Sequence, residues 1–157
     1  MAADTQGDTL ILGVGNPLKG DDGAGVLVVQ RLLARPDLPP GVTVLDGGTA
    51  GLGLIPLIEN YRRVVLVDAA LMGETPGTVR RFAWREARVA GHERPLSLHQ
   101  SDLADALTLA EALGSLPPEV IVFGVQPQHT DWEQPLSEAV ARALPDLIEA
   151  LLSEVRS

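Results

Sequence analysis

Cysteine is absent from this chain of 157 residues. That absence excludes disulfide bonds, thiolate zinc sites, iron–sulfur clusters and a cysteine nucleophile supplied by the chain itself. Positive charge is scarce as well, because 12 Lys and Arg residues face 21 Asp and Glu residues and leave a formal net charge of −9. Such a chain repels nucleic-acid phosphates and anionic lipids, so we expect neither nucleic acid nor a membrane as a partner.

The sequence also lacks a long hydrophobic run and a targeting signal. No apolar stretch approaches the roughly 20 residues that a membrane helix needs. Met1–Thr9 is polar and carries Asp4 and Asp8, whereas a secretory peptide would be basic and then apolar. We therefore expect the cytoplasm as the compartment, and we expect residues 1–8 to be flexible.

The remaining composition is that of an ordinary globular protein, with 45% hydrophobic and 21% charged residues. Short β-branched runs alternate with longer amphipathic stretches, a pattern typical of α/β proteins. We expect one α/β domain over residues 1–157, with three layers. Its mostly parallel, twisted sheet has about five strands and carries helices on both faces.

The expected elements follow from this alternation. Strands are predicted at residues 10–14, 42–45, 64–67, 78–84 and 120–125, helices at about 23–34, 52–58, 101–113 and 136–155, and a charged loop at 85–95. Proline lacks an amide donor, so the last helix is predicted to be interrupted or kinked near Pro145. Ligands of such sheets bind outside the carboxyl ends of the strands, which directs attention to residues 16–22, 46–49, 68 and 126–129.

The glycine-rich loop after the first strand invites a dinucleotide-binding interpretation. The Rossmann pattern requires glycine where Leu18 stands, and the carboxylates of Asp21 and Asp22 would repel a pyrophosphate. A phosphate-binding Walker loop fails too, because Asp21 follows Gly20 where lysine is required. Nucleotide binding is therefore disfavoured. A local explanation for both acids, hydrogen bonding at the start of a helix, stays open.

Three polar residues on separate segments are expected to meet at the carboxyl edge of the sheet: Asp22, Asp68 and His99. Two carboxylates and an imidazole suit zinc or nickel and leave a coordination position open for water or substrate. An acid that ends an apolar strand, like Asp68, needs a partner or a cation. Structural roles for Asp68 and His99, and an aspartic-protease pair of Asp22 with Asp68, remain alternatives.

The motifs together resemble one known family, the hydrogenase maturation proteases. The resemblance rests on Gly13-Val14-Gly15-Asn16, Asp21-Asp22-Gly23, Asp46-Gly47-Gly48-Thr49-Ala50-Gly51, Val67-Asp68-Ala69, Ser97-Leu98-His99-Gln100 and Gly124-Val125-Gln126-Pro127, which follow one another in order. It implies a cytoplasmic endopeptidase that trims a C-terminal extension from the large-subunit precursor of a nickel-iron hydrogenase after nickel has been inserted.

The resemblance also implies roles for individual residues. It assigns catalysis and metal binding to Asp22, Asp68 and His99, and substrate selection to Asp46, Gly47, Gly48 and Thr49. The nickel would be supplied by the substrate, with zinc or cadmium as possible substitutes and no further cofactor. A monomer is expected, from the family and from the negative charge. A non-catalytic nickel carrier or checkpoint for the immature subunit, using the same residues, is the alternative function.

Overall fold

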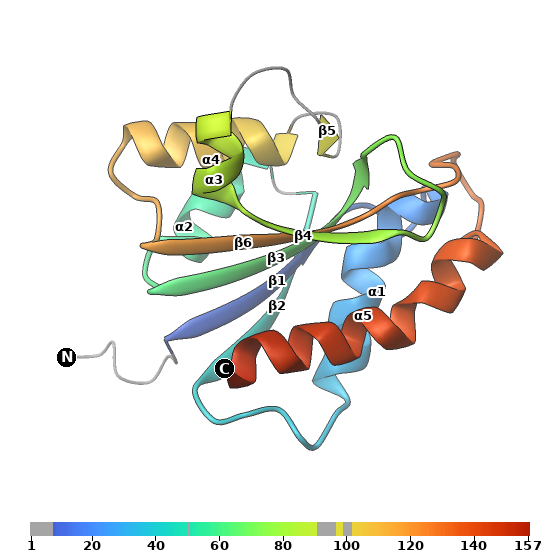
Figure 1. The fold of residues 1–157 in the computed structure, drawn as a ribbon, viewed down its shortest axis with the longest axis horizontal. Coiled ribbons are helices and arrows are strands. Elements are labelled where there is room, and N and C mark those ends of the chain that lie inside the picture. Colours follow the sequence, from blue (N-terminus) through green and yellow to red (C-terminus); the bar gives the residue numbers. More distant parts are fainter. Residues whose placement is uncertain (1–7, 50, 91–96, 99–101) are drawn as a thin grey trace.

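A twisted sheet forms the middle layer of the protein (Figure 1). The computed structural model describes residues 8–49, 51–90, 97–98 and 102–157. Its strands are β1 (Thr9–Val14), β2 (Val42–Gly48), β3 (Arg63–Leu71), β4 (Val79–Ala83) and β6 (Glu119–Val125), in the order β2-β1-β3-β6-β4. Strand β4 is antiparallel to β6, whereas the other neighbours in this order are parallel. The short strand β5 (Ser97–Leu98) pairs antiparallel with the end of β3.

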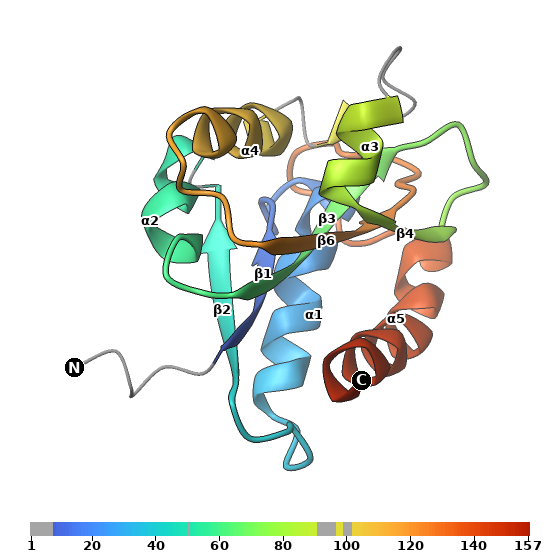
Figure 2. The ribbon, with the colours of Figure 1, turned by 60° about the vertical axis from the view of Figure 1, so that its left-hand side comes forward.

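Helices cover both faces of this sheet. Helices α1 (Ala24–Leu33) and α5 (Glu138–Arg156) lie on one face, and α2 (Leu54–Ile58), α3 (Trp84–Ala90) and α4 (Asp102–Ala112) lie on the other (Figures 1 and 2). Two 3-10 turns, η2 (Gly20–Gly23) and η3 (Gly51–Gly53), precede α1 and α2. Within the described ranges, no helix is long and apolar enough to span a membrane. The predicted α/β architecture, with its mostly parallel sheet, is confirmed.

Strands β2 and β3 run past their predicted ends, because each finds a partner that is distant in the sequence. Strand β2 continues from Leu45 to Gly48, since Asp46 pairs with Gly13 and Gly48 with Val14. Strand β3 continues past Asp68 to Leu71, because β6 and then β5 pair with its last residues. Asp68 therefore lies within a strand and not at its end.

The prediction of a loop over residues 85–95 is wrong for residues 85–90, because α3 runs from Trp84 to Ala90. The segment has no regular apolar stripe, but it is rich in the helix formers Arg, Glu and Ala, and the side chain of Trp84 is buried in the core. Residues 91–95 lie outside the described part of the chain, as does Ser101 of the predicted 101–113 helix. The prediction of flexibility over residues 1–8 is likewise outside it, except for Asp8.

Helix α5 runs through Pro145 as one element, so the predicted interruption is wrong. An internal proline costs about 3 kcal/mol. Opposing that cost is a continuous buried stripe on the same helix, formed by Val140, Leu144, Leu147, Ile148, Leu151 and Leu152. Each of these side chains contributes roughly 1.5–3 kcal/mol when fully buried, so burial outweighs the penalty.

The sheet separates two apolar cores, because side chains alternate between the faces of a strand. On β3, Val65 and Val67 pack with α1 and α5, whereas Val64 and Leu66 pack with α2 and α4. Asp68 follows Leu66 in this alternation and faces the second core, on the same side as Ala70. A carboxylate thus occupies a position where every neighbour in the pattern is apolar.

Helix α1 packs unusually close to the sheet, and glycine makes this possible. A Cβ atom on Gly25 would lie 2.3 Å from the carbonyl oxygen of Val67 and 2.7 Å from that of Val14. A Cβ atom on Gly13 would lie 2.2 Å from the carbonyl oxygen of Gly25. The backbone of α1 therefore rests directly on β1 and β3, which brings the turn η2 to the carboxyl ends of these strands.

Candidate active site

The loops that follow β1 and β2 meet at the carboxyl edge of the sheet. The amide of Gly15 donates a hydrogen bond of 2.9 Å to the carbonyl oxygen of Gly48 and so joins the first two loops. Gly15 has a φ of 131°, a conformation that side chains other than glycine disfavour. The chain then turns through Asn16 into η2, which carries the two adjacent acids.

Asp22 lies in η2 and only 4% of it is exposed. Its Oδ2 accepts a hydrogen bond of 2.9 Å from the backbone amide of Asn16. Asp68 is fully buried, and its Oδ1 accepts a hydrogen bond of 2.8 Å from the amide of Ala69. Both predicted acids are therefore withdrawn from bulk solvent, as a carboxylate in a reaction centre would be.

Gly15 lies next to both acidic residues. A Cβ atom built on Gly15 would lie 1.9 Å from the carbonyl oxygen of Asp22 and 3.8 Å from Oδ1 of Asp68. The structure therefore brings these two residues together around one glycine, although 45 residues separate them in the sequence. Any side chain at Gly15 would collide with the backbone of η2 beside Asp68.

His99, the third predicted residue, lies outside the described part of the chain. The two residues before it form β5, in which Leu98 pairs with Ala70, two residues beyond Asp68. Among the described residues, no group of three His, Asp or Glu side chains is placed to hold a metal ion. The three-residue metal site thus stays a prediction of the sequence.

The predicted substrate loop forms the end of β2. The Oδ1 atom of Asp46 accepts a hydrogen bond of 2.8 Å from the amide of Gly48, which has a φ of 53°. Gly47 is buried, and a Cβ there would lie 3.1–3.2 Å from the side chains of Leu12 and Val14. Asp46 and Thr49 are exposed, so the loop presents polar groups beside the acids while its glycines anchor it.

Asp21 differs from its neighbour Asp22, and sequence reasoning missed the difference. The Asp21 carboxylate accepts hydrogen bonds from the amides of Gln128, His129 and Ser137 and from the hydroxyl of Ser137. The alternative that Asp21 serves the start of its own helix is therefore wrong, because its partners lie on the segment between β6 and α5. The only signal in the sequence was the pair of adjacent acids.

Gln126, at the end of β6, holds the loop between β3 and β4. Its side-chain Oε1 accepts hydrogen bonds from the amides of Met72 (2.7 Å) and Glu74 (3.4 Å). Its backbone exchanges bonds of 2.8 Å with Gly77 and Thr78. Gln126, which the sequence placed among the candidate ligand-binding positions, thus has a structural role. It fixes the loop that follows β3.

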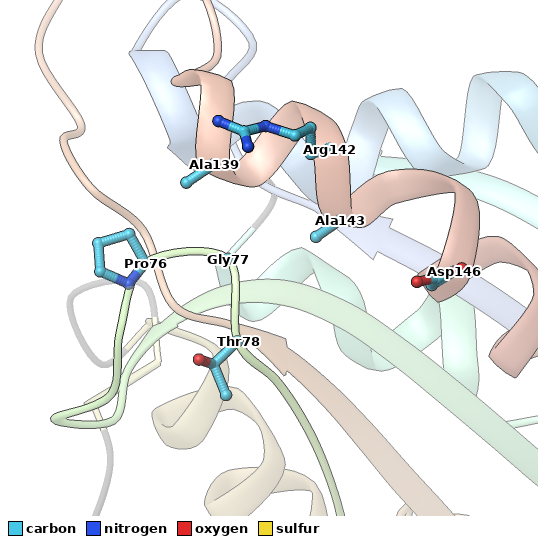
Figure 3. A pocket seen from close by; sticks show the side chains of 7 residues that line it. All are labelled: Pro76, Gly77, Thr78, Ala139, Arg142, Ala143 and Asp146. Carbon is cyan, nitrogen blue, oxygen red and sulfur yellow. The ribbon is translucent and has the colours of Figure 1, made fainter.

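An open pocket of about 440 Å³ lies between that loop and α5 (Figure 3). Its lining consists of Pro76, Gly77, Thr78, Ala139, Arg142, Ala143 and Asp146. None of the predicted site residues belongs to this lining, and α5 packs on the face of the sheet opposite to that of Asp68. This pocket is therefore separate from the cluster of acids around Gly15.

Comparisons with known proteins agree with this arrangement. A family model described as hydrogenase maturation protease matches residues 26–154. The hydrogenase expression/formation protein HupD of Rhizobium leguminosarum bv. viciae is 34% identical over 149 residues, which cover 94% of this chain and 74% of HupD. The hydrogenase 2 maturation protease of Escherichia coli K12 is also 34% identical, over 94% of this chain and 90% of its own length.

Solved structures show the same fold. The hydrogenase maturating endopeptidase HybD from E. coli superimposes with a TM-score of 0.80 and 32% identity, over 94% of this chain and 91% of HybD. A hydrogenase maturation protease HycI from Thermococcus kodakarensis gives a TM-score of 0.74 and 25% identity, over 98% of this chain and 96% of its own. Sequence and structure thus agree over nearly all of the chain, which belongs to the hydrogenase maturation protease family, a family of endopeptidases.

Proposed function

We propose that this protein is an endopeptidase that removes a C-terminal extension from the large-subunit precursor of a nickel-iron hydrogenase once nickel has been inserted. The observation that carries the proposal is that two buried acids, Asp22 and Asp68, both adjoin Gly15 near the carboxyl edge of the sheet. Membership of the hydrogenase maturation protease family supports peptide-bond hydrolysis as the reaction.

Nickel enters this proposal as part of the substrate and not as a resident cofactor. Carboxylate and imidazole groups are suitable ligands for a divalent nickel ion, so Asp22, Asp68 and His99 would engage the metal that the precursor carries. The hydrogen bonds to Asp22 Oδ2 and Asp68 Oδ1 are compatible with this role, because a carboxylate has about four lone-pair positions. Cleavage would then depend on a loaded precursor.

The loop of Asp46 to Thr49 is the proposed contact for the peptide that is cut. It adjoins the acids through the hydrogen bond between Gly15 and Gly48, and its exposed residues face solvent at the same edge. Backbone groups near Gly48 are suited to hold an extended peptide, because glycine allows close approach of another chain. In this arrangement the loop selects the segment while the acids respond to the metal.

The test is an incubation of the purified protein with precursor in nickel-loaded and nickel-free forms, followed by mass spectrometry of the large subunit. We expect a loss of mass at the C-terminus of the loaded precursor alone. Asp68→Asn should abolish that loss, whereas the matched control Asp146→Asn, an exposed acid on α5, should retain it. Equal cleavage of both precursors would refute nickel recognition.

Binding of the loaded precursor without any cleavage would favour the alternative, a non-catalytic nickel checkpoint. We further propose that the protein acts in the cytoplasm as a monomer. The net charge of −9 supports the monomer, because it makes copies of the chain repel one another. Light scattering at physiological salt would test this, with a mass near 16.6 kDa as the expected result.

A further inference from the structure

Asp21 is a fully buried carboxylate with an unusually complete set of partners. Its Oδ1 accepts a hydrogen bond of 2.7 Å from the amide of Ser137. Its Oδ2 accepts bonds of 2.8 Å from the Ser137 hydroxyl, 2.8 Å from the Gln128 amide and 3.3 Å from the His129 amide. All four donors belong to the segment between β6 and α5, more than 100 residues away in the sequence.

Further contacts attach the same turn to that segment. The amide of Asp21 donates to the carbonyl oxygen of His129, and the amide of Gly20 donates to that of Gln134, both at 3.0 Å. Gly20 has a φ of 56°, and a Cβ there would lie 2.6 Å from Nδ1 of His129. The Ser137 hydroxyl also accepts from the amide of Val140 and so caps α5. The first turn of α5 and the turn η2 are therefore joined through one carboxylate.

The geometry of η2 transmits this attachment to Asp22. A 3-10 turn has three residues per turn, so adjacent side chains point in directions about 120° apart. With Asp21 bonded to the β6–α5 segment, Asp22 is directed elsewhere, and its Oδ2 meets the amide of Asn16. Because η2 spans only four residues, a rotation that released Asp21 would also turn Asp22.

We propose that Asp21 is a positioning residue for the reaction, which fixes η2 so that Asp22 stays at the Asn16 amide beside Asp68. The expected effect on cleavage rests on the proposed function. The expected effect on the position of Asp22 does not. The charge of the carboxylate matters, because asparagine has one acceptor oxygen and one donor group in its place. Either orientation of the amide of Asp21→Asn would set an N–H against at least one of the present donors.

The experiment measures two quantities in Asp21→Asn. The first is hydrogen exchange at the Asn16 amide, which reports directly on the bond to Asp22 and requires neither nickel nor precursor. The second is the steady-state cleavage of nickel-loaded precursor. We expect faster exchange at Asn16, and a kcat lower by roughly ten- to a hundredfold, the factor that corresponds to loss of a charge-assisted hydrogen bond.

Glu154→Gln is the matched control for lost stability. Glu154 pairs with Arg63, the first residue of β3, and with Arg81 on β4, so its loss should lower the melting temperature without changing exchange at Asn16 or kcat. Should Asp21→Asn fail to fold, Ser137→Ala removes the hydroxyl donor and leaves the three backbone donors in place. It is expected to accelerate Asn16 exchange to a smaller extent.

The proposal would be overturned if Asp21→Asn folds and its Asn16 amide exchanges no faster than that of Glu154→Gln. If only Ser137→Ala can be studied, unchanged exchange at Asn16 in that variant would overturn it. Faster exchange with normal kcat would also overturn it, by showing that the position of Asp22 does not limit the reaction. If the wild-type protein cleaves no precursor, the proposed function fails. The exchange measurement then still decides whether Asp21 holds Asp22 in place.

Discussion

The substitution Gly25→Ala raises helix propensity but disrupts the close packing of α1 on the sheet. Gly25 is the second residue of α1, where alanine would stabilise the helix by up to about 1 kcal/mol. The added Cβ, however, would lie 2.3 Å from the carbonyl oxygen of Val67 and 2.7 Å from that of Val14. These are backbone atoms of central strands and cannot rotate away, so the whole of α1 must shift.

Overpacking of a core costs about 1–3 kcal/mol, and we expect the upper end of that range because both obstacles are backbone. The net destabilisation is then about 2 kcal/mol, which corresponds to a fall in melting temperature of roughly 4–8 °C for a chain of this size. Thermal unfolding followed by circular dichroism measures it. Gln30→Ala, on the exposed face of the same helix, is the control and should change stability by less than about 0.5 kcal/mol. A melting temperature of Gly25→Ala at or above that of the wild type would refute the packing argument.

Three further predictions concern the site and the opposite edge of the sheet. His99→Ala should abolish processing and leave the circular dichroism spectrum unchanged; a loss of helical signal would indicate a structural role. Asp46→Ala should raise KM for the precursor at unchanged kcat, since it releases the bond to the Gly48 amide; a lower kcat alone would count against a role in substrate selection. A hydrogen bond from Arg81 lowers the pKa of Glu154, so this ion pair stabilises the protein above about pH 5 and is lost as the pH falls through the lowered pKa. Urea unfolding should therefore show a stability difference between wild type and Glu154→Gln that closes in acid, and a difference independent of pH would contradict this.

The periodicity of the sequence was sufficient for much of the fold. The runs at residues 10–14, 64–67 and 120–125 are apolar on both faces, as strands covered by helices on both sides must be, and each became a strand of the sheet. The amphipathic pattern at 23–34 became α1. These predictions succeeded because the signal is local. An element that buries one stripe or both faces has apolar residues at a regular spacing in its own sequence.

Other features depended on partners that are distant along the chain. The extension of β3 beyond Asp68 requires β5 and β6, and the strand character of Asp46 to Gly48 requires β1. Likewise, α5 continues through Pro145 because its buried stripe packs against the sheet. In each case the local sequence favoured a loop or a break. Strand pairing or side-chain burial stabilised the regular element by more than this local preference cost.

The two adjacent acids show the same division at the site. Their residue types and their place after a strand predicted an acidic site at the carboxyl edge, and the resemblance singled out Asp22. Nothing in the order of residues distinguished the hydrogen bonds of Asp21 from those of Asp22. That difference arises because the fold brings Ser137 and Gln128 to one side of η2, and Asn16 and Gly15 to the other. Packing decides which partners each acid binds, because the partners of Asp21 lie more than 100 residues away in the sequence.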